Sequence, residues 1–88
     1  MTTSERIISE IEGTVQGHYG DWRIGIANDP SDRKTRMANT ANISCWRQWA
    51  ADSLADAQEI EEHFVDKKMM RARGSGALDS RTVFVYIF

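Results

Sequence analysis

Residues 21–37 of this 88-residue chain read DWRIGIANDPSDRKTRM and predict a strand that leads directly into a helix. The strand, Asp21 to Ala27, alternates an apolar face with a nearly bare one, with Trp22, Ile24 and Ile26 against Arg23, Gly25 and Ala27. Asp29 can cap the helix, and Pro30 suits its first position because that position needs no backbone N–H donor. We therefore expect a short helix from Pro30 to about Met37.

The N-terminal segment predicts another helix, from Thr2 to about Gln16. Thr2 and Glu5 have the spacing of a capping box, and apolar residues recur on one face at helical spacing, namely Ile7, Ile8, Ile11 and Val15. Gly17 is a suitable residue to end this helix, since glycine readily adopts the left-handed conformation found after helix ends.

The second half of the chain predicts a strand, a helix and a final strand. Ile43–Ala50 has the β-branched and aromatic content of a strand, with Cys45 and Trp49 on one side and Trp46 on the other. A capping box begins a helix that runs from Ser53 to about Lys68, and a flexible loop follows over Arg71–Arg81. Thr82–Phe88 is apolar on both faces, so we expect it in the interior of a sheet, paired with the first strand.

These elements predict one small α+β domain over residues 1–88, with a three-stranded sheet, helices packed on it and the order α-β-α-β-α-β. No stretch approaches the roughly 20 apolar residues that span a bilayer, and no signal peptide is visible, so we expect a cytoplasmic protein without a membrane partner. The one cysteine, Cys45, excludes an internal disulfide and is expected to be buried.

The net charge of -2 is unevenly distributed along the chain. Residues 48–62 contain five acidic and no basic residues, whereas residues 63–88 contain five basic and two acidic ones. A nucleic-acid surface would therefore be a local patch. The candidates for phosphate contact are Lys34, Arg36, Lys67, Lys68, Arg71 and Arg73, although a charge run of this kind also fits a solvated helix end.

The helix expected after Ser53 carries one carboxylate on its apolar stripe. In a helical projection Glu61 falls inside the sector of Leu54, Ala57, Ile60, Phe64 and Val65. A carboxylate on a core-facing stripe loses hydration unless it is paired, protonated or bound to a cation. Glu61 is therefore a candidate metal ligand. The alternative is a carboxylate at the edge of the stripe, with its head in solvent or bonded to an arginine.

The bare face of the first strand is the second candidate site. Gly25 leaves an open patch of sheet that a ligand or another backbone could approach, and Arg33 follows eight residues later on the short helix. The alternative is that Gly25 makes room for a packed helix while Arg33 lies on a solvated face.

The run RIGIANDPSDR, residues 23–33, resembles the second half-motif of the GIY-YIG nuclease superfamily, where a Tyr-Ile-Gly strand leads through an Asp turn to an arginine. The arginine lies eight residues past the glycine, as Arg33 does here, and Arg23 stands where the family has tyrosine. The following long helix offers Glu61 in the place of the family's metal-binding glutamate. The resemblance covers roughly residues 22–65 and implies a GIY-YIG-like fold.

The resemblance implies phosphodiester hydrolysis, with Arg33 stabilising the phosphate charge and Glu61 holding Mg²⁺ or Mn²⁺. A tyrosine, or a water that the tyrosine positions, would manage the proton of the nucleophile. No Gly-Ile-Tyr strand precedes the motif, so the final strand would take its place in a circularly permuted arrangement that brings Tyr86 to the site, with Tyr19 as the second choice. The catalytic candidates are thus Arg33, Tyr86 and Arg23, although both tyrosines also fit an ordinary structural role.

Two hypotheses of function follow. From the sequence we favour a non-catalytic module that kept the fold and binds nucleic acid or a protein, without a cofactor. The alternative is a divalent-metal-dependent DNA endonuclease or nicking enzyme. Only the enzyme requires Arg33 and Glu61 to converge on one pocket beside a tyrosine.

Overall fold

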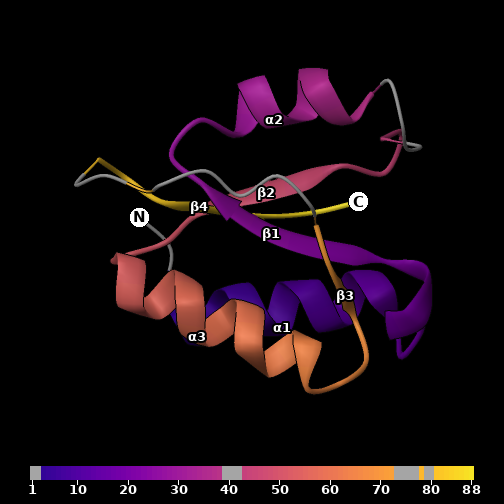
Figure 1. The fold of residues 1–88 in the computed structure, drawn as a ribbon. Coiled ribbons are helices and arrows are strands. Elements are labelled where there is room, and N and C mark those ends of the chain that lie inside the picture. The colour runs from indigo at the N-terminus through magenta and orange to yellow at the C-terminus, as the bar shows by residue number, and fades with distance from the viewer. Residues whose placement is uncertain (1–2, 39–42, 73–77, 79–80) are drawn as a thin grey trace.

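The structure is a computed structural model that describes residues 3–38, 43–72, 78 and 81–88. Within these residues it is a small α+β fold with three α-helices and a four-stranded mixed sheet (Figure 1). The helices are α1 (Ser4–Val15), α2 (Pro30–Met37) and α3 (Leu54–Val65), with a 3₁₀ helix, η1 (Tyr19–Asp21). The strands are β1 (Arg23–Ala27), β2 (Arg47–Ala50), β3 (Met70–Arg71) and β4 (Phe84–Ile87).

The sheet has the strand order β2-β4-β1-β3. The C-terminal strand β4 lies between β2 and β1 and is antiparallel to both, so the predicted interior position and its pairing with β1 are confirmed. The expectation of three strands is wrong, because β3 adds a fourth, parallel to β1. Both residues of β3 are exposed. Such a strand has no apolar alternation by which the sequence could reveal it.

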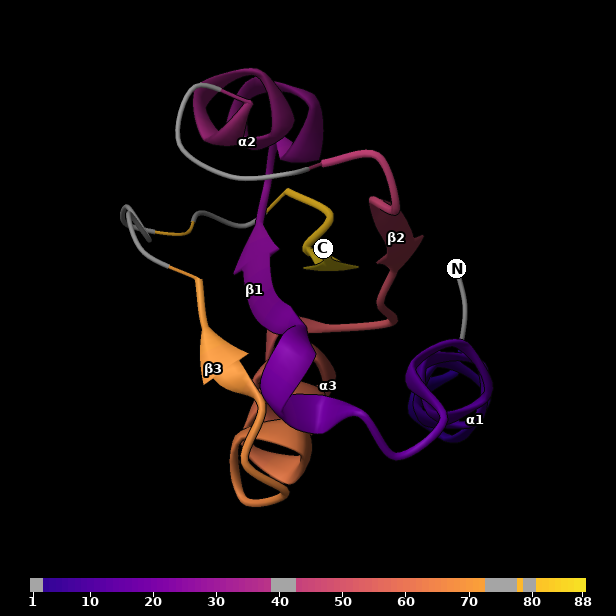
Figure 2. The ribbon, with the colours of Figure 1, turned by 90° about the vertical axis from the view of Figure 1, so that its right-hand side faces the viewer.

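The helices form a layer on each face of the sheet (Figures 1 and 2). Helices α1 and α3 lie together on one face, and α2 lies alone on the other. The main core fills the space between the sheet and the α1–α3 layer, with fully buried side chains that include Ile7, Ile24, Ile60, Phe64 and Val85. A smaller cluster of Ala27, Tyr86 and Phe88 lies on the face of α2. No helix in the described part of the chain is long and apolar enough to cross a membrane.

The local signals at the helix ends are largely confirmed. Asp29 accepts a hydrogen bond from the backbone N–H of Asp32 (3.1 Å), and Ser53 accepts one from Asp56 (3.1 Å). At the N-terminus the cap is Thr3 and not Thr2, and its side chain accepts from the backbone N–H of Arg6. Helix α1 ends as predicted, with Gln16 (φ 49°) and Gly17 (φ 82°) both in the left-handed region.

Several predicted elements are longer than the observed ones, most clearly β2 and α3. Strand β2 begins only at Arg47, the residue that faces Ile87 on β4. Cys45 lies in the turn before it and is exposed, so its predicted burial is wrong. Helix α3 ends at Val65 and not at Lys68, which adopts a left-handed φ of 78° as the chain reverses into β3.

Candidate functional site

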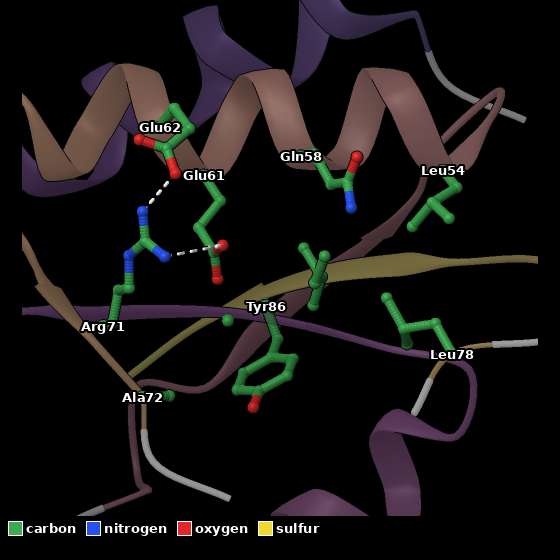
Figure 3. A pocket seen from close by; sticks show the side chains of 10 residues that line it. Leu54, Gln58, Glu61, Glu62, Arg71, Ala72, Leu78 and Tyr86 are labelled. Carbon is green, nitrogen blue, oxygen red and sulfur yellow. Dashed lines mark hydrogen bonds and ion pairs between the residues drawn. The ribbon is translucent and has the colours of Figure 1, made fainter. Parts of the chain in front are cut away.

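A cleft of about 610 Å³ opens between α3 and the edge of β1 (Figure 3). It is lined by the α3 residues Leu54, Gln58, Glu61 and Glu62, by Gly25 and Ile26 of β1, and by Arg71, Ala72, Leu78 and Tyr86. Its volume lies within the usual range of ligand-binding pockets, roughly 300–1,000 Å³. It is therefore large enough to admit part of a polymer or a small molecule.

The cleft exists because β3 pairs with only the first part of β1. Met70 and Arg71 lie opposite Arg23 and Ile24, and the backbone N–H of Ala72 donates to the carbonyl of Ile24 (2.8 Å). Gly25 and Ile26, which come next on β1, line the cleft.

Tyr86 occupies the bare face of β1, which the sequence analysis treated as open to a ligand or another backbone. A Cβ atom at Gly25 would stand 2.5 Å from Cζ and Oη of Tyr86, so the phenol ring lies directly on the glycine. Trp46 stacks on the other side of the ring, with ring centroids 4.6 Å apart and an interplanar angle of 9°. The absence of a side chain at Gly25 thus positions a tyrosine.

Two of the residues that the sequence analysis proposed as a site, Arg33 and Glu61, affect the pKa of the Tyr86 hydroxyl. Burial raises the pKa of the Tyr86 hydroxyl above its usual value, the charge of Arg33 lowers it, and the charge of Glu61 raises it further. Arg33 comes from α2 and Glu61 from α3, on opposite faces of the sheet. Figure 3 shows the ring of Tyr86 pointing away from α3 while Glu61 points from α3 toward the sheet. Arg33 itself is not among the residues that line the cleft.

Glu61 lies at the charged end of the cleft. Its side chain is only 16% exposed, and Oε1 lies 4.0 Å from Nη1 of Arg71, whose second nitrogen is hydrogen-bonded to Glu62. Burial raises the pKa of the Glu61 carboxyl, the charge of Arg71 lowers it, and Glu62 raises it. The alternative of a carboxylate paired with an arginine describes this arrangement, and the role of Glu61 as a metal ligand stays a prediction.

The donor atoms around Glu61 are compatible with a magnesium or manganese ion. No group of three or more His, Cys, Asp or Glu side chains suited to a metal occurs among the described residues. Mg²⁺ is nevertheless often bound through one or two carboxylates together with waters and substrate phosphates. Glu61 lines the cleft together with Glu62 and Gln58, so two carboxylates and a side-chain amide are available there as oxygen ligands.

The remaining basic candidates are distributed over several surfaces. Arg71 lines the cleft, whereas Lys34 and Arg36 are exposed on α2, where Arg36 pairs with Asp32 at 3.1 Å. Arg23 is exposed at the start of β1 and does not line the cleft.

Lys67 and Lys68 follow α3 at its C-terminal end. Lys67 pairs with Glu12 of α1 (3.5 Å) and lies over the ring of Tyr19, which itself packs against Phe64. The structure therefore does not bring Lys67 or Tyr19 to the cleft. Arg73 lies outside the described residues.

Gln58, Leu54 and the backbone of Ile26 line the cleft without having been predicted from the sequence. A signal for Gln58 was present, because it precedes Glu61 by three residues, and residues three apart share a helix face. Comparisons of the chain with protein-family models, curated proteins and solved structures find no match. Function is therefore inferred from the residues of the cleft and their geometry.

Proposed function

We propose that the chain is a divalent-metal-dependent nuclease that cleaves phosphodiester bonds in DNA, in the manner of the GIY-YIG enzymes that it resembles. One observation carries the proposal. Glu61 and Tyr86, from elements far apart in the sequence, line the same cleft, while Arg33 does not line it and reaches Tyr86 only through its charge, which lowers the pKa of the hydroxyl. A carboxylate and a tyrosine at one opening are two of the three groups that such an enzyme requires, and a binding module requires neither.

The order of the strands supports the permuted form of the resemblance. Tyr86 lies opposite Gly25 in the antiparallel pair of β1 and β4, so the tyrosine comes from the strand next to the Ile-Gly-Ile strand although it follows it by about 60 residues. A GIY-YIG site needs a tyrosine-bearing strand beside its Ile-Gly strand, and β4 supplies one. Arg33 stands one turn into α2, whose start is fixed by Asp29 and Pro30.

Each residue has a distinct chemical task. Arg33 offsets the negative charge that builds on the phosphate as water attacks the phosphorus atom and the ester oxygen departs. Tyr86 keeps its proton at neutral pH because burial raises its pKa, so its hydroxyl can orient the attacking water by a hydrogen bond. Glu61 would hold the metal ion, which when bound polarises the phosphoryl oxygen and stabilises the leaving group.

A second function is favoured by the contact between Arg71 and Glu61. A carboxylate that already has a guanidinium partner does not need a cation, and Arg71 could then bind a phosphate without cleavage. The chain would in that case be a non-catalytic module that binds nucleic acid.

Nicking of supercoiled plasmid DNA in Mg²⁺ or Mn²⁺ tests the proposal. We expect the parent to convert plasmid to the open circular form, and Tyr86→Phe, Glu61→Gln and Arg33→Ala each to reduce the rate at least a hundredfold. Chelation should abolish nicking by the parent.

Two matched variants control for general damage. Tyr19→Phe removes the hydroxyl of the other tyrosine, which packs against Phe64 and does not line the cleft, and Glu59→Gln neutralises an exposed glutamate of α3 that does not line the cleft either. Both should nick as the parent does. Plasmid binding by a folded parent that never nicks in either metal would contradict the nuclease and leave the binding module.

A further inference from the structure

The cleft extends beyond the residues of the proposed reaction. Figure 3 shows Glu62 and Arg71 at one end, and Leu54 and Leu78 at the other, on opposite sides of the opening. Leu54 is one of the few large apolar side chains that remain exposed in the described part of the chain (37%). One end of the cleft is thus charged and the other apolar.

The floor of the apolar end carries a backbone donor and acceptor. Arg23 and Phe88 exchange two backbone hydrogen bonds (2.8 and 3.1 Å), and the polar groups of alternate residues in an antiparallel pair point to opposite sides. The backbone N–H and C=O groups of Ile24 and Ile26 therefore point away from β4. Ile24 bonds Ala72, but within the described residues no partner strand reaches Ile26, so its N–H and C=O face the cleft.

A side-chain amide stands above this floor. Gln58 lies on α3 between Leu54 and Glu61, and Figure 3 shows its amide pointing from the helix toward the sheet. An amide carries both donors and an acceptor, so Gln58 can exchange two hydrogen bonds with one ligand edge. The apolar end thus combines two leucines with a convergent set of donors and acceptors.

We propose that this end of the cleft is a nucleobase subsite, which takes the unstacked base of a nucleotide whose phosphate lies at the charged end. This inference rests on the proposed function, because it places the base beside the phosphate site. Leu54 and Leu78 contact the faces of the base, while Gln58 and the backbone of Ile26 bond its edge. The chemistry fits a base, which has apolar faces and an edge of donors and acceptors.

A peptide added as a further strand is a poorer match to these groups. Strand addition requires a row of alternating backbone groups along the receiving edge. Past Ile24 the β1 edge offers only the N–H and C=O of Ile26 before the strand ends at Ala27. A peptide backbone also carries no charge that would need the charged end of the cleft, whereas a nucleotide always brings a phosphate.

Amide NMR of the full chain in chelator, where nothing is cleaved, tests the subsite. The probes are the four deoxynucleoside 5′-monophosphates and 2-deoxyribose 5-phosphate, which lacks a base. We expect the nucleotides to shift the amides of Ile26, Leu54 and Gln58 and to bind at least tenfold more tightly than the sugar phosphate. Leu54→Ala and Gln58→Ala should each weaken nucleotide binding about tenfold and leave sugar phosphate binding unchanged.

Glu59→Ala is the matched control, since Glu59 neighbours Gln58 on α3 but is exposed and does not line the cleft. Equal affinity for nucleotides and sugar phosphate, or shifts at Ile26 caused by an extended peptide and not by nucleotides, would overturn the subsite. Plasmid nicking with no preference for nucleotides refutes the subsite alone. Selective nucleotide binding without nicking refutes the nuclease alone.

Discussion

Gly25→Ala is expected to displace Tyr86, because the new methyl group and the phenol ring cannot occupy their present positions together. The added Cβ would stand 2.5 Å from Cζ and from Oη and 2.9 Å from Cε2 of Tyr86. Unstrained Cβ contacts are longer than about 3.4 Å, so the ring or the strand must move. The ring has little freedom, since Trp46 stacks on it with centroids 4.6 Å apart.

The magnitude follows from three contributions. Overpacking of a filled site costs about 1–3 kcal/mol. Loss of the stacked pair with Trp46 adds about 0.5–1.5 kcal/mol if the ring leaves its place. Alanine lowers the conformational entropy of the unfolded chain, and this offsets about 0.4–1 kcal/mol of the loss in stability. The net loss of folding free energy is about 2 kcal/mol, which lowers the Tm of a domain this size by about 8–16 °C.

Thermal unfolding followed by circular dichroism measures this loss. Gly13→Ala is the control, because Gly13 lies in α1 and a Cβ added there would meet no atom within 4 Å, so alanine should stabilise the helix by about 0.5–1 kcal/mol. Adding Tyr86→Ala to Gly25→Ala should show favourable coupling, since the clash disappears. A Gly25→Ala variant as stable as the parent would refute the reasoning that the glycine exists to accommodate the ring.

Three further predictions follow from the same contacts. Burial raises the pKa of the Glu61 carboxyl, so the folded state favours the protonated form, and the stability that this form contributes is lost as pH rises. In urea unfolding with chelator, Glu61→Gln should therefore have the same free energy of unfolding as the parent at low pH and a higher one, by roughly 1 kcal/mol, at neutral pH. A gain independent of pH would contradict this. Ser53→Ala should cost about 1 kcal/mol in the same assay, because it removes the N-cap of α3. Arg33→Ala should reduce the slope of log K against log salt for DNA binding by about 0.9, measured by anisotropy, and an unchanged slope would show that Arg33 contacts no phosphate.

Some residues of the candidate site could be predicted from the sequence, but not their arrangement. Glu61 stands out because a helical projection places it among apolar side chains, and Arg33 because its helix follows a strand with a bare face. The position of the Tyr86 ring on Gly25 depends on the register of β1 and β4, which joins residues about 60 positions apart. The approach of Arg71 to Glu61 depends on β3, a strand of two exposed residues without any pattern.

The sequence by itself determined the elements whose signals are local. Asp29 and Pro30 define the start of α2, and consecutive residues of β1 show its alternation. Caps and amphipathic periods involve only residues that are near one another in the sequence. The interior place of β4 was also determined, since a strand apolar on both faces cannot lie at an exposed edge. Only the tertiary structure decided the fourth strand, the exposure of Cys45 and the placement of Glu61 and Tyr86 on one cleft, because each depends on how distant segments pack.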